Sequence, residues 1–112
     1  MPDPASLLAD QVAAWNRGDL DGYCDLCSPD VTYLTASGAV VGRDALRARM
    51  RERYPDPKAM GTLSLEVDRM DVRGDVAIGV LRWSVGPGRG GGALVVMELR
   101  DGRWWLVYDA TV

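Results

Sequence analysis

The chain has 112 residues, of which 47% are hydrophobic and 26% charged, which predicts a single globular domain over residues 1–112. Its formal net charge of −3 does not favour electrostatic attraction to the phosphates of a nucleic acid, so we expect no nucleic-acid partner. The sequence contains no histidine, which excludes imidazole acid–base chemistry, histidine-activated nucleophiles and histidine-ligated metals and leaves carboxylates as the leading candidates for proton transfer.

Residues 1–15 carry no basic leader, and the acidic residues Asp3 and Asp10 interrupt their apolar positions. This pattern is neither a signal peptide nor a membrane span, and no later apolar run reaches membrane length. Two cysteines without a secretion signal favour a reducing compartment. We therefore expect a cytoplasmic protein that makes no membrane contact.

A first helix is predicted after Asp3-Pro4, a pair suited to an N-cap and a first turn. Its apolar residues recur at helical spacing, and Gly18 is a natural stop after the last of them. These apolar residues are Leu8, Val12 and Trp15.

A second helix is predicted after Asp19, and residues 28–30, Ser-Pro-Asp, end it. Its apolar face consists of Leu20, Tyr23, Cys24 and Cys27. The two cysteines form a single CxxC, whereas a structural zinc usually needs four Cys or His ligands. A thioredoxin-like motif would lie at a strand-to-helix junction rather than within a helix. We expect two buried thiols and no metal.

Residues 31–36 alternate and are β-branched, which predicts a strand, and Gly38 turns the chain into a short partner strand at 39–41. A third helix is expected after Gly42, with Pro55 and Pro57 beyond its end. Its apolar face consists of Leu46, Met50 and Tyr54. Five arginines also fall on this helix, at positions 43, 47, 49, 51 and 53. They could bind phosphate or carboxylate, but a solvated helix face is the simpler interpretation.

The rest of the chain is predicted to be an antiparallel meander. Strands at 62–72 and 76–85 flank a tight Arg-Gly-Asp turn, and strands at 93–99 and 103–112 flank Asp101-Gly102, a strong hairpin signal. Between the two hairpins, residues 86–92 read GPGRGGG, which lacks the ending of a phosphate-binding P-loop. We expect this segment to be a mobile loop at the rim of the sheet.

Helices followed by a long meander predict an α+β fold with the helices on one face of a curved sheet. At this point the chain resembles the SnoaL-like, ketosteroid-isomerase-like family of the nuclear transport factor 2-like superfamily, over nearly its whole length. The matching features are Trp15 before Gly18-Asp19, Asp30-Val31-Thr32 leading into a strand, Gly42 before the third helix, and Asp101-Gly102 before a strand that ends in Tyr108-Asp109.

The resemblance implies a cone in which three N-terminal helices pack on a strongly curved antiparallel sheet, the cystatin-like α+β roll. It also implies a pocket on the concave side of the sheet and a homodimer through the convex side. It implies no particular chemistry, because the superfamily includes isomerases, cyclases, dehydratases, binding modules and association domains.

Ketosteroid isomerases of this family use an aspartate base, with a tyrosine and a protonated aspartate as oxyanion donors. The residues at the matching positions here are Thr35 for the base, Gln11 for the tyrosine and, approximately, Val95 for the second aspartate. None of the three can perform the role. The resemblance therefore argues against a steroid isomerase.

Asp109 is the carboxylate most suited to a functional role, because the family register turns it toward the cone interior with Trp105, Val107 and Thr111. Burial there would raise its pKa. The structural alternative is a carboxylate bonded to the backbone or to an arginine. Tyr33 is the second candidate catalytic residue, because its hydroxyl could donate to an oxyanion. The expected pocket residues are Gln11, Trp15, Thr35, Met50, Tyr54, Trp83, Val95, Met97, Trp105 and Val107.

The same register turns Trp104, Leu106 and Tyr108 outward, away from the pocket. A row of this kind on a sheet should not stay exposed in a monomer. We therefore expect the chain to pair with itself through the convex face of the sheet.

Two functions remain open at this stage. In the first, the pocket binds a small, mostly apolar carbonyl-containing metabolite without turnover, or the domain is only a dimerisation scaffold. In the second, the protein is an isomerase, cyclase or dehydratase that needs no cofactor, in which Asp109 moves a proton while Tyr33, Gln11 or Thr35 polarises a carbonyl. An enzyme requires a free Asp109 carboxyl, whereas a binding module would tie it to protein donors.

Overall fold

The computed structural model describes residues 2–112, and in this range it forms a mixed α+β fold, as the sequence predicts. The helices are α1 (Pro4–Asn16), α2 (Leu20–Asp25), α3 (Arg43–Arg53) and the short 3-10 helix η1 (Pro57–Ala59). The strands are β1 (Cys27–Thr35), β2 (Gly38–Val41), β3 (Thr62–Arg73), β4 (Val76–Gly86), β5 (Arg89–Arg100) and β6 (Arg103–Thr111). No described helix is long and apolar enough to cross a membrane.

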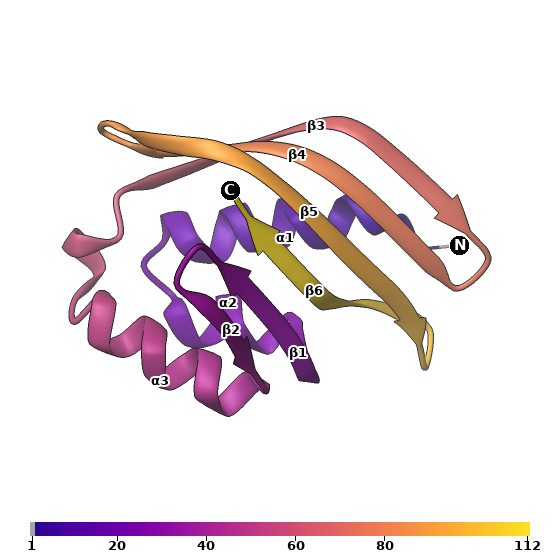
Figure 1. The fold of residues 1–112 in the computed structure, drawn as a ribbon, viewed down its shortest axis with the longest axis horizontal. Helices are drawn as coiled ribbons and strands as arrows, with labels where there is room; N and C mark the ends of the chain where they lie inside the picture. The colour runs from indigo at the N-terminus through magenta and orange to yellow at the C-terminus, as the bar shows by residue number, and fades with distance from the viewer. Residues whose placement is uncertain (1) are drawn as a thin grey trace.

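The strands form one six-stranded sheet in the order β2-β1-β6-β5-β4-β3. All neighbouring pairs are antiparallel except β1 with β6, which run parallel. The last strand of the chain therefore lies between the first hairpin and the meander. In Figure 1 the long strands β3, β4 and β5 arch over α1, while α3 lies beside β1 and β2.

Local sequence explains where the helices begin. The Asp3 carboxylate accepts a hydrogen bond from the Ala5 amide at 2.9 Å, and Asp19 accepts one from the Gly22 amide at the same distance, so each caps its helix as expected. Helix α3 starts after Gly42, whose φ of 97° lies in a region that side chains rarely adopt.

Strand β1 begins at Cys27, so the prediction that Cys27 belongs to the second helix and that residues 28–30 form a break is wrong. Helix α2 stops after Asp25 because the chain then pairs with β6. The Leu106 amide donates to the Leu26 carbonyl at 3.2 Å, and Cys27 pairs with Leu106. The residues around Cys27 give no sequence pattern that predicts parallel pairing with a strand so distant along the chain.

The glycine-rich segment 86–92 is mostly strand, which corrects the prediction of a mobile loop. Strand β4 runs through Gly86 and β5 starts at Arg89, so only Pro87 and Gly88 form the turn. Glycine is needed beyond the turn because a Cβ at position 91 would overlap the carbonyl oxygen of Val112. The Val112 amide then donates to the Gly92 carbonyl at 2.9 Å.

Strand β6 changes its alternation midway, at a β-bulge. Its pairing with β5 passes from Met97–Leu106 to Val96–Tyr108, which leaves Val107 as an extra residue. Trp104 and Leu106 therefore face the helices, with 6% and 1% of their surface exposed, while Tyr108 faces outward and is 52% exposed. The prediction that Trp104 and Leu106 point outward is wrong, because the bulge shifts the alternation by one residue.

Candidate functional site

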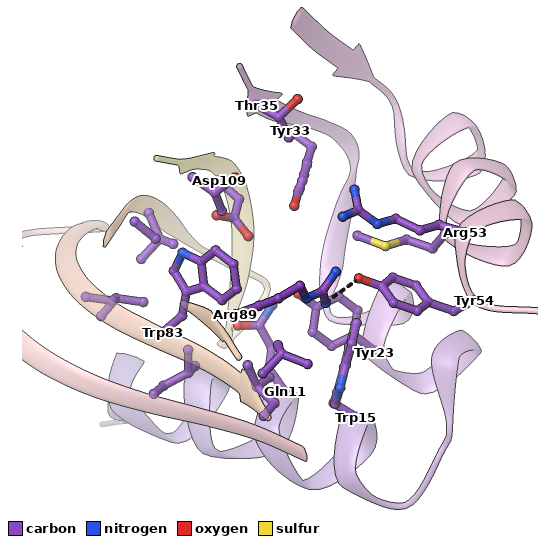
Figure 2. A pocket seen from close by; sticks show the side chains of 18 of the residues that line it. Gln11, Trp15, Tyr23, Tyr33, Thr35, Arg53, Tyr54, Trp83, Arg89 and Asp109 are labelled. Carbon is purple, nitrogen blue, oxygen red and sulfur yellow. Dashed lines mark hydrogen bonds between the residues drawn. The ribbon is translucent and has the colours of Figure 1, made fainter. Parts of the chain in front are cut away.

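A cavity of about 240 Å³ lies between the concave side of the sheet and the three helices (Figure 2). Strands β3, β4 and β5 supply one wall, which is apolar. Its residues include Leu63, Leu65, Leu81, Trp83, Val85 and Val95. The helices supply the opposite wall, with Gln11, Trp15, Tyr23, Met50 and Tyr54.

The two tryptophans of the cavity offer only apolar surface to its interior. The Trp15 indole nitrogen donates to the Met60 carbonyl at 3.1 Å, and that of Trp83 donates to the Gly92 carbonyl at 3.1 Å. Trp15 is also fixed by edge-to-face contacts with Tyr23 and Tyr54, each with ring centroids 5.1 Å apart. Both rings are therefore fixed in place, and their only polar atoms are already hydrogen-bonded to the backbone.

Asp109 places a carboxyl in this apolar surrounding. It lies on β6 beyond the bulge, next to Tyr33 on β1 and Val95 on β5. The residue as a whole is half-buried, but its Oδ1 atom has no exposed surface and no hydrogen-bond partner among the described residues. Burial raises the pKa of Asp109 from 3.8 to about 6. The carboxyl can therefore gain or lose a proton near neutral pH.

Two phenol groups accompany this carboxyl. Burial raises the pKa of Tyr33 above its usual range, and the charge of nearby Asp109 raises it further. The pKa of Tyr23 is raised for the same two reasons, burial being the larger. Both hydroxyls consequently stay protonated and can act as hydrogen-bond donors at the cavity surface. Figure 2 shows the Tyr33 ring extending from β1 into the space beside Asp109.

Gln11 and Thr35 differ in what they can offer a ligand. Gln11 is buried on α1, and its side-chain nitrogen Nε2 has no hydrogen-bond partner among residues 2–112. The Thr35 hydroxyl donates to the Gly38 carbonyl at 3.4 Å and accepts from the Ser37 amide at 3.2 Å, so the turn between β1 and β2 already uses it. Gln11 is thus the available donor.

Arginines occupy a further part of the cavity lining. Arg49 and Arg53 come from α3 and Arg89 from the start of β5. The Arg89 Nη2 atom donates to the Tyr54 hydroxyl at 2.9 Å, which joins the β4–β5 hairpin to the end of α3 (Figure 2).

The structure brings most of the predicted site residues together around this cavity. Those that line it are Asp109, Tyr33, Gln11, Trp15, Thr35, Met50, Tyr54, Trp83 and Val95. Thr35, Gln11 and Val95, at the positions that match the steroid-isomerase residues, are thus all at the cavity.

Three predicted pocket residues do not line the cavity. Met97 is completely buried in the core. Val107 is the bulge residue, and the indole nitrogen of Trp105 donates to the Arg100 carbonyl while the Arg103 guanidinium lies 3.7 Å from its ring. The predictions for Trp105 and Val107 fail for the same reason as those for Trp104 and Leu106, the shift of alternation in β6.

Among the lining residues that sequence reasoning missed, four carry a phenol or a guanidinium group, Tyr23, Arg49, Arg53 and Arg89, and the others are apolar, Leu63, Leu65, Leu81, Val85 and Ala93. Tyr23 was assigned to a helix core and the arginines of α3 to a solvated face. A signal was present for two of them, because Arg49 follows Leu46 by three residues and Arg53 follows Met50 by three, a spacing that places them beside the apolar face of the helix. For Arg89, within a glycine run, no such signal exists.

No cluster of three or more potential metal ligands occurs in the described part of the chain. The two cysteines are free and buried, and burial raises their pKa values, to about 11 for Cys24 and about 12 for Cys27. They therefore stay protonated as inert thiols. The chemistry available at the cavity is that of one carboxyl, three phenols, two threonine hydroxyls, an amide and the arginines.

Comparisons with known proteins agree with this architecture. No curated protein matches the chain. Among solved structures, it is similar to an NTF-2 like protein of unknown function from Shewanella oneidensis MR-1, with 26% identity and a TM-score of 0.90 over 96% of this chain and 93% of that one. A domain of unknown function with a cystatin-like fold from Nostoc punctiforme shares 23% identity, with a TM-score of 0.76 over 96% of this chain and 72% of that one.

A de novo designed protein with a curved β-sheet is also similar, with 16% identity and a TM-score of 0.71 over 97% of this chain and 98% of that one. A likeness of this kind concerns the fold alone. The sequence pattern of the SnoaL-like domain, by contrast, matches residues 8–107, which is most of the chain. The protein therefore belongs to the SnoaL-like domain family, within the nuclear transport factor 2-like superfamily.

Proposed function

We propose that the cavity binds a small, mostly apolar molecule that carries a carbonyl group. The observation that carries this proposal is a pair of buried polar atoms, Gln11 Nε2 and Asp109 Oδ1, that have no partner among residues 2–112 and whose residues line an otherwise largely apolar cavity. An unsatisfied buried polar group costs about 1–3 kcal/mol. A ligand carbonyl that accepts from Gln11, or from protonated Asp109, would offset that cost.

The size of the cavity limits the ligand. At about 240 Å³ it is slightly smaller than the roughly 300 Å³ at which typical small-molecule pockets begin. The aromatic rings of Trp15 and Trp83, on opposite walls, favour a flat or cyclic apolar body between them. We therefore expect a metabolite of one or two rings or a short chain.

A second candidate function is cofactor-independent proton transfer on such a carbonyl compound. It is favoured by the Oδ1 atom of Asp109, which accepts no hydrogen bond from the described residues, and by the pKa of about 6 of this carboxyl. In this reaction the carboxylate removes a proton from the carbon next to the carbonyl, and the Tyr33 or Tyr23 hydroxyl donates to the enolate oxygen. Return of the proton to a different carbon completes an isomerisation.

One experiment tests both proposals with α-tetralone, a flat two-ring ketone. Binding should change the fluorescence of Trp15 and Trp83, and in heavy water the wild-type protein should speed deuterium exchange at the carbon next to the carbonyl. Asp109→Asn should retain binding but lose the exchange, while Asp101→Asn, in an exposed turn, should retain both. No binding of α-tetralone, of related ketones or of organic acids and amides of similar size at millimolar concentration would contradict the first proposal. Exchange that survives in Asp109→Asn would contradict the second.

We further propose that the protein forms a homodimer through the convex face of the sheet. Support comes from a row of apolar residues on adjacent strands, Leu34 beside Ala110 beside Leu94 beside Val80, with Tyr108 in the next row. Leu94 is 47% exposed and Tyr108 52%, an apolar surface typical of interfaces. The predicted row consists of Trp104, Leu106 and Tyr108, of which only Tyr108 is exposed, because Trp104 and Leu106 are buried.

Sedimentation tests the dimer. The wild type should sediment as a dimer at micromolar concentration, and Leu94→Lys should sediment as a monomer with an unchanged circular dichroism spectrum. A wild-type monomer would contradict the proposal.

We also propose a cytoplasmic location, which the free state of the neighbouring thiols of Cys24 and Cys27 supports.

A further inference from the structure

The arginines that line the cavity differ from most others in the described chain, because they have no carboxylate partner. Arginines that form ion pairs are Arg17, Arg47, Arg51, Arg73, Arg82 and Arg100. In contrast, Arg49, Arg53 and Arg89 lie within 4.0 Å of no carboxylate among residues 2–112. In a protein with more acidic than basic residues, unpaired arginines at one cavity indicate a site for an anion.

Two of these guanidinium groups approach the same aromatic ring. The central guanidinium carbon of Arg53 lies 5.8 Å from the centroid of the Tyr54 ring, and that of Arg89 lies 5.7 Å from it. The two side chains come from different elements, α3 and β5, and Figure 2 shows them extending toward the middle of the cavity from opposite sides. Like charges held near one ring repel, and an anion between them would remove that repulsion.

The donors of these groups are also mostly free. A guanidinium carries five N–H groups, and the side chain of Arg89 uses one hydrogen bond, to the Tyr54 hydroxyl. The side chains of Arg49 and Arg53 make no hydrogen bond with the described residues. A planar carboxylate fits such donors with two parallel hydrogen bonds.

The acidic groups of the site do not neutralise these arginines. Asp109 forms no ion pair with an arginine among residues 2–112, and Figure 2 shows the Tyr33 ring between Asp109 and Arg53. Glu52 lines a neighbouring surface depression with Arg49 and Arg53 but forms no ion pair with either. Arg53 and Arg89, which are exposed, thus line the open side of the cavity, whereas the Oδ1 atom of Asp109 is buried in its interior.

Resting on the proposed binding function, we infer that the ligand is an amphipathic organic acid. Its apolar body packs on Trp83 and the apolar wall, and its carboxylate is held by Arg53 and Arg89, with Arg49 adding positive charge. This arrangement leaves the far end of the ligand beside Asp109, Tyr33 and Gln11. The substrate class is therefore a small keto or enoyl carboxylic acid rather than a neutral ketone.

Matched pairs of probes test this inference. Cinnamate, 4-phenylbutyrate and octanoate are each titrated beside their own primary amides, which have nearly the same shape and no charge, with the fluorescence of Trp15 and Trp83 as the readout. Each acid should bind at least about tenfold more tightly than its amide, a difference of about 1.4 kcal/mol. In the double variant Arg53→Gln/Arg89→Gln the ratio should fall to about one, with amide affinity unchanged.

The matched control is Arg69→Gln, which removes an exposed arginine of β3 that is outside the cavity and forms no ion pair. It should keep the wild-type ratio. As a check that needs no variant, 0.5 M NaCl should lower the ratio for the wild type, because salt screens the charge.

The outcomes separate the two proposals. Equal binding of acids and amides would overturn the inference and leave the binding function standing. A preference for acids that persists in the double variant would overturn the assignment to Arg53 and Arg89. Binding of neither acids nor amides, together with no binding of α-tetralone, would overturn the proposed function and the inference with it.

Discussion

The concave face of the sheet has two parts that β6 crosses in turn, and they are filled in opposite ways. The packed part, around Met97, Trp104 and Leu106, leaves almost no exposed surface on these side chains. The cavity part, around Asp109 and Tyr33, keeps a space of about 240 Å³ and polar atoms without partners. The bulge at Val107 separates them. The packed part therefore contributes most of the buried apolar contacts that stabilise the fold. The cavity part contributes fewer such contacts and leaves space that a ligand could fill.

The largest expected effect distinguishes the two parts by truncation. Leu106→Ala should lower the free energy of unfolding by about 3–4 kcal/mol, because it removes a fully buried side chain and leaves a void. Leu65→Ala, at the half-buried wall of an existing cavity, should cost about 1 kcal/mol. Urea unfolding followed by circular dichroism measures both. Equal costs would remove the distinction between the two parts.

A second test concerns the carboxyl of the cavity part. Below about pH 4 Asp109 is protonated in both the folded and the unfolded chain and carries no penalty. Because its pKa rises from 3.8 to about 6 on folding, the unfolded chain loses the proton first as the pH increases. Stability should therefore fall between about pH 4 and pH 6, by about 3 kcal/mol from this group, since one pKa unit corresponds to about 1.4 kcal/mol.

Asp109→Asn isolates that contribution from those of other carboxyls, such as Asp30, whose pKa is lowered to about 2 mainly by its bond with Arg100 and which acts in the opposite direction. The stability of Asp109→Asn relative to wild type should increase between pH 4 and pH 7 and then stay constant. Thermal melts across this range at constant ionic strength provide the measurement. A difference that does not change with pH would mean that folding leaves the pKa of this carboxyl unchanged, and a decrease with pH would mean that protein donors stabilise the carboxylate.

The smallest expected effect compares two arginines of α3. Arg47 bridges Asp21 and Asp25 of α2, so Arg47→Gln should cost about 0.5–1 kcal/mol. Arg53→Gln, which removes an unpaired charge at the cavity, should leave stability unchanged or slightly higher. The two variants differ only in position on the helix, and thermal melts at low salt compare them. A larger loss for Arg53→Gln would show that this arginine has a structural role.

The sequence predicts those parts of the fold that rest on local chemistry. Asp3 and Asp19 cap helices as expected, and Asp101-Gly102 closes the last hairpin between β5 and β6. The order of these elements was sufficient to predict the family, and the resemblance to that family predicted that Asp109 faces the cavity. Such features depend on neighbouring residues, which a reader of the sequence can see.

What could not be predicted depends on contacts between distant segments. In the run Trp104 to Tyr108 every residue is apolar or aromatic, so no pattern marks Val107 as the bulge. The position of Arg89 opposite Tyr54 likewise requires the β4–β5 hairpin to reach the end of α3. A charge-rich helix also hides which of its faces is solvated, because Arg47 and Arg53 are the same residue type in different surroundings.

The parallel pairing of β1 with β6 has a consequence for folding kinetics. Tyr33 lies beside Asp109 only when the last strand inserts between β1 and β5, and contacts between segments this far apart along the chain form slowly. A chain in which the β3–β5 meander has formed but β6 has not docked lacks one side of the cavity. Ligand affinity should therefore appear in the final phase of refolding, later than most of the helical signal.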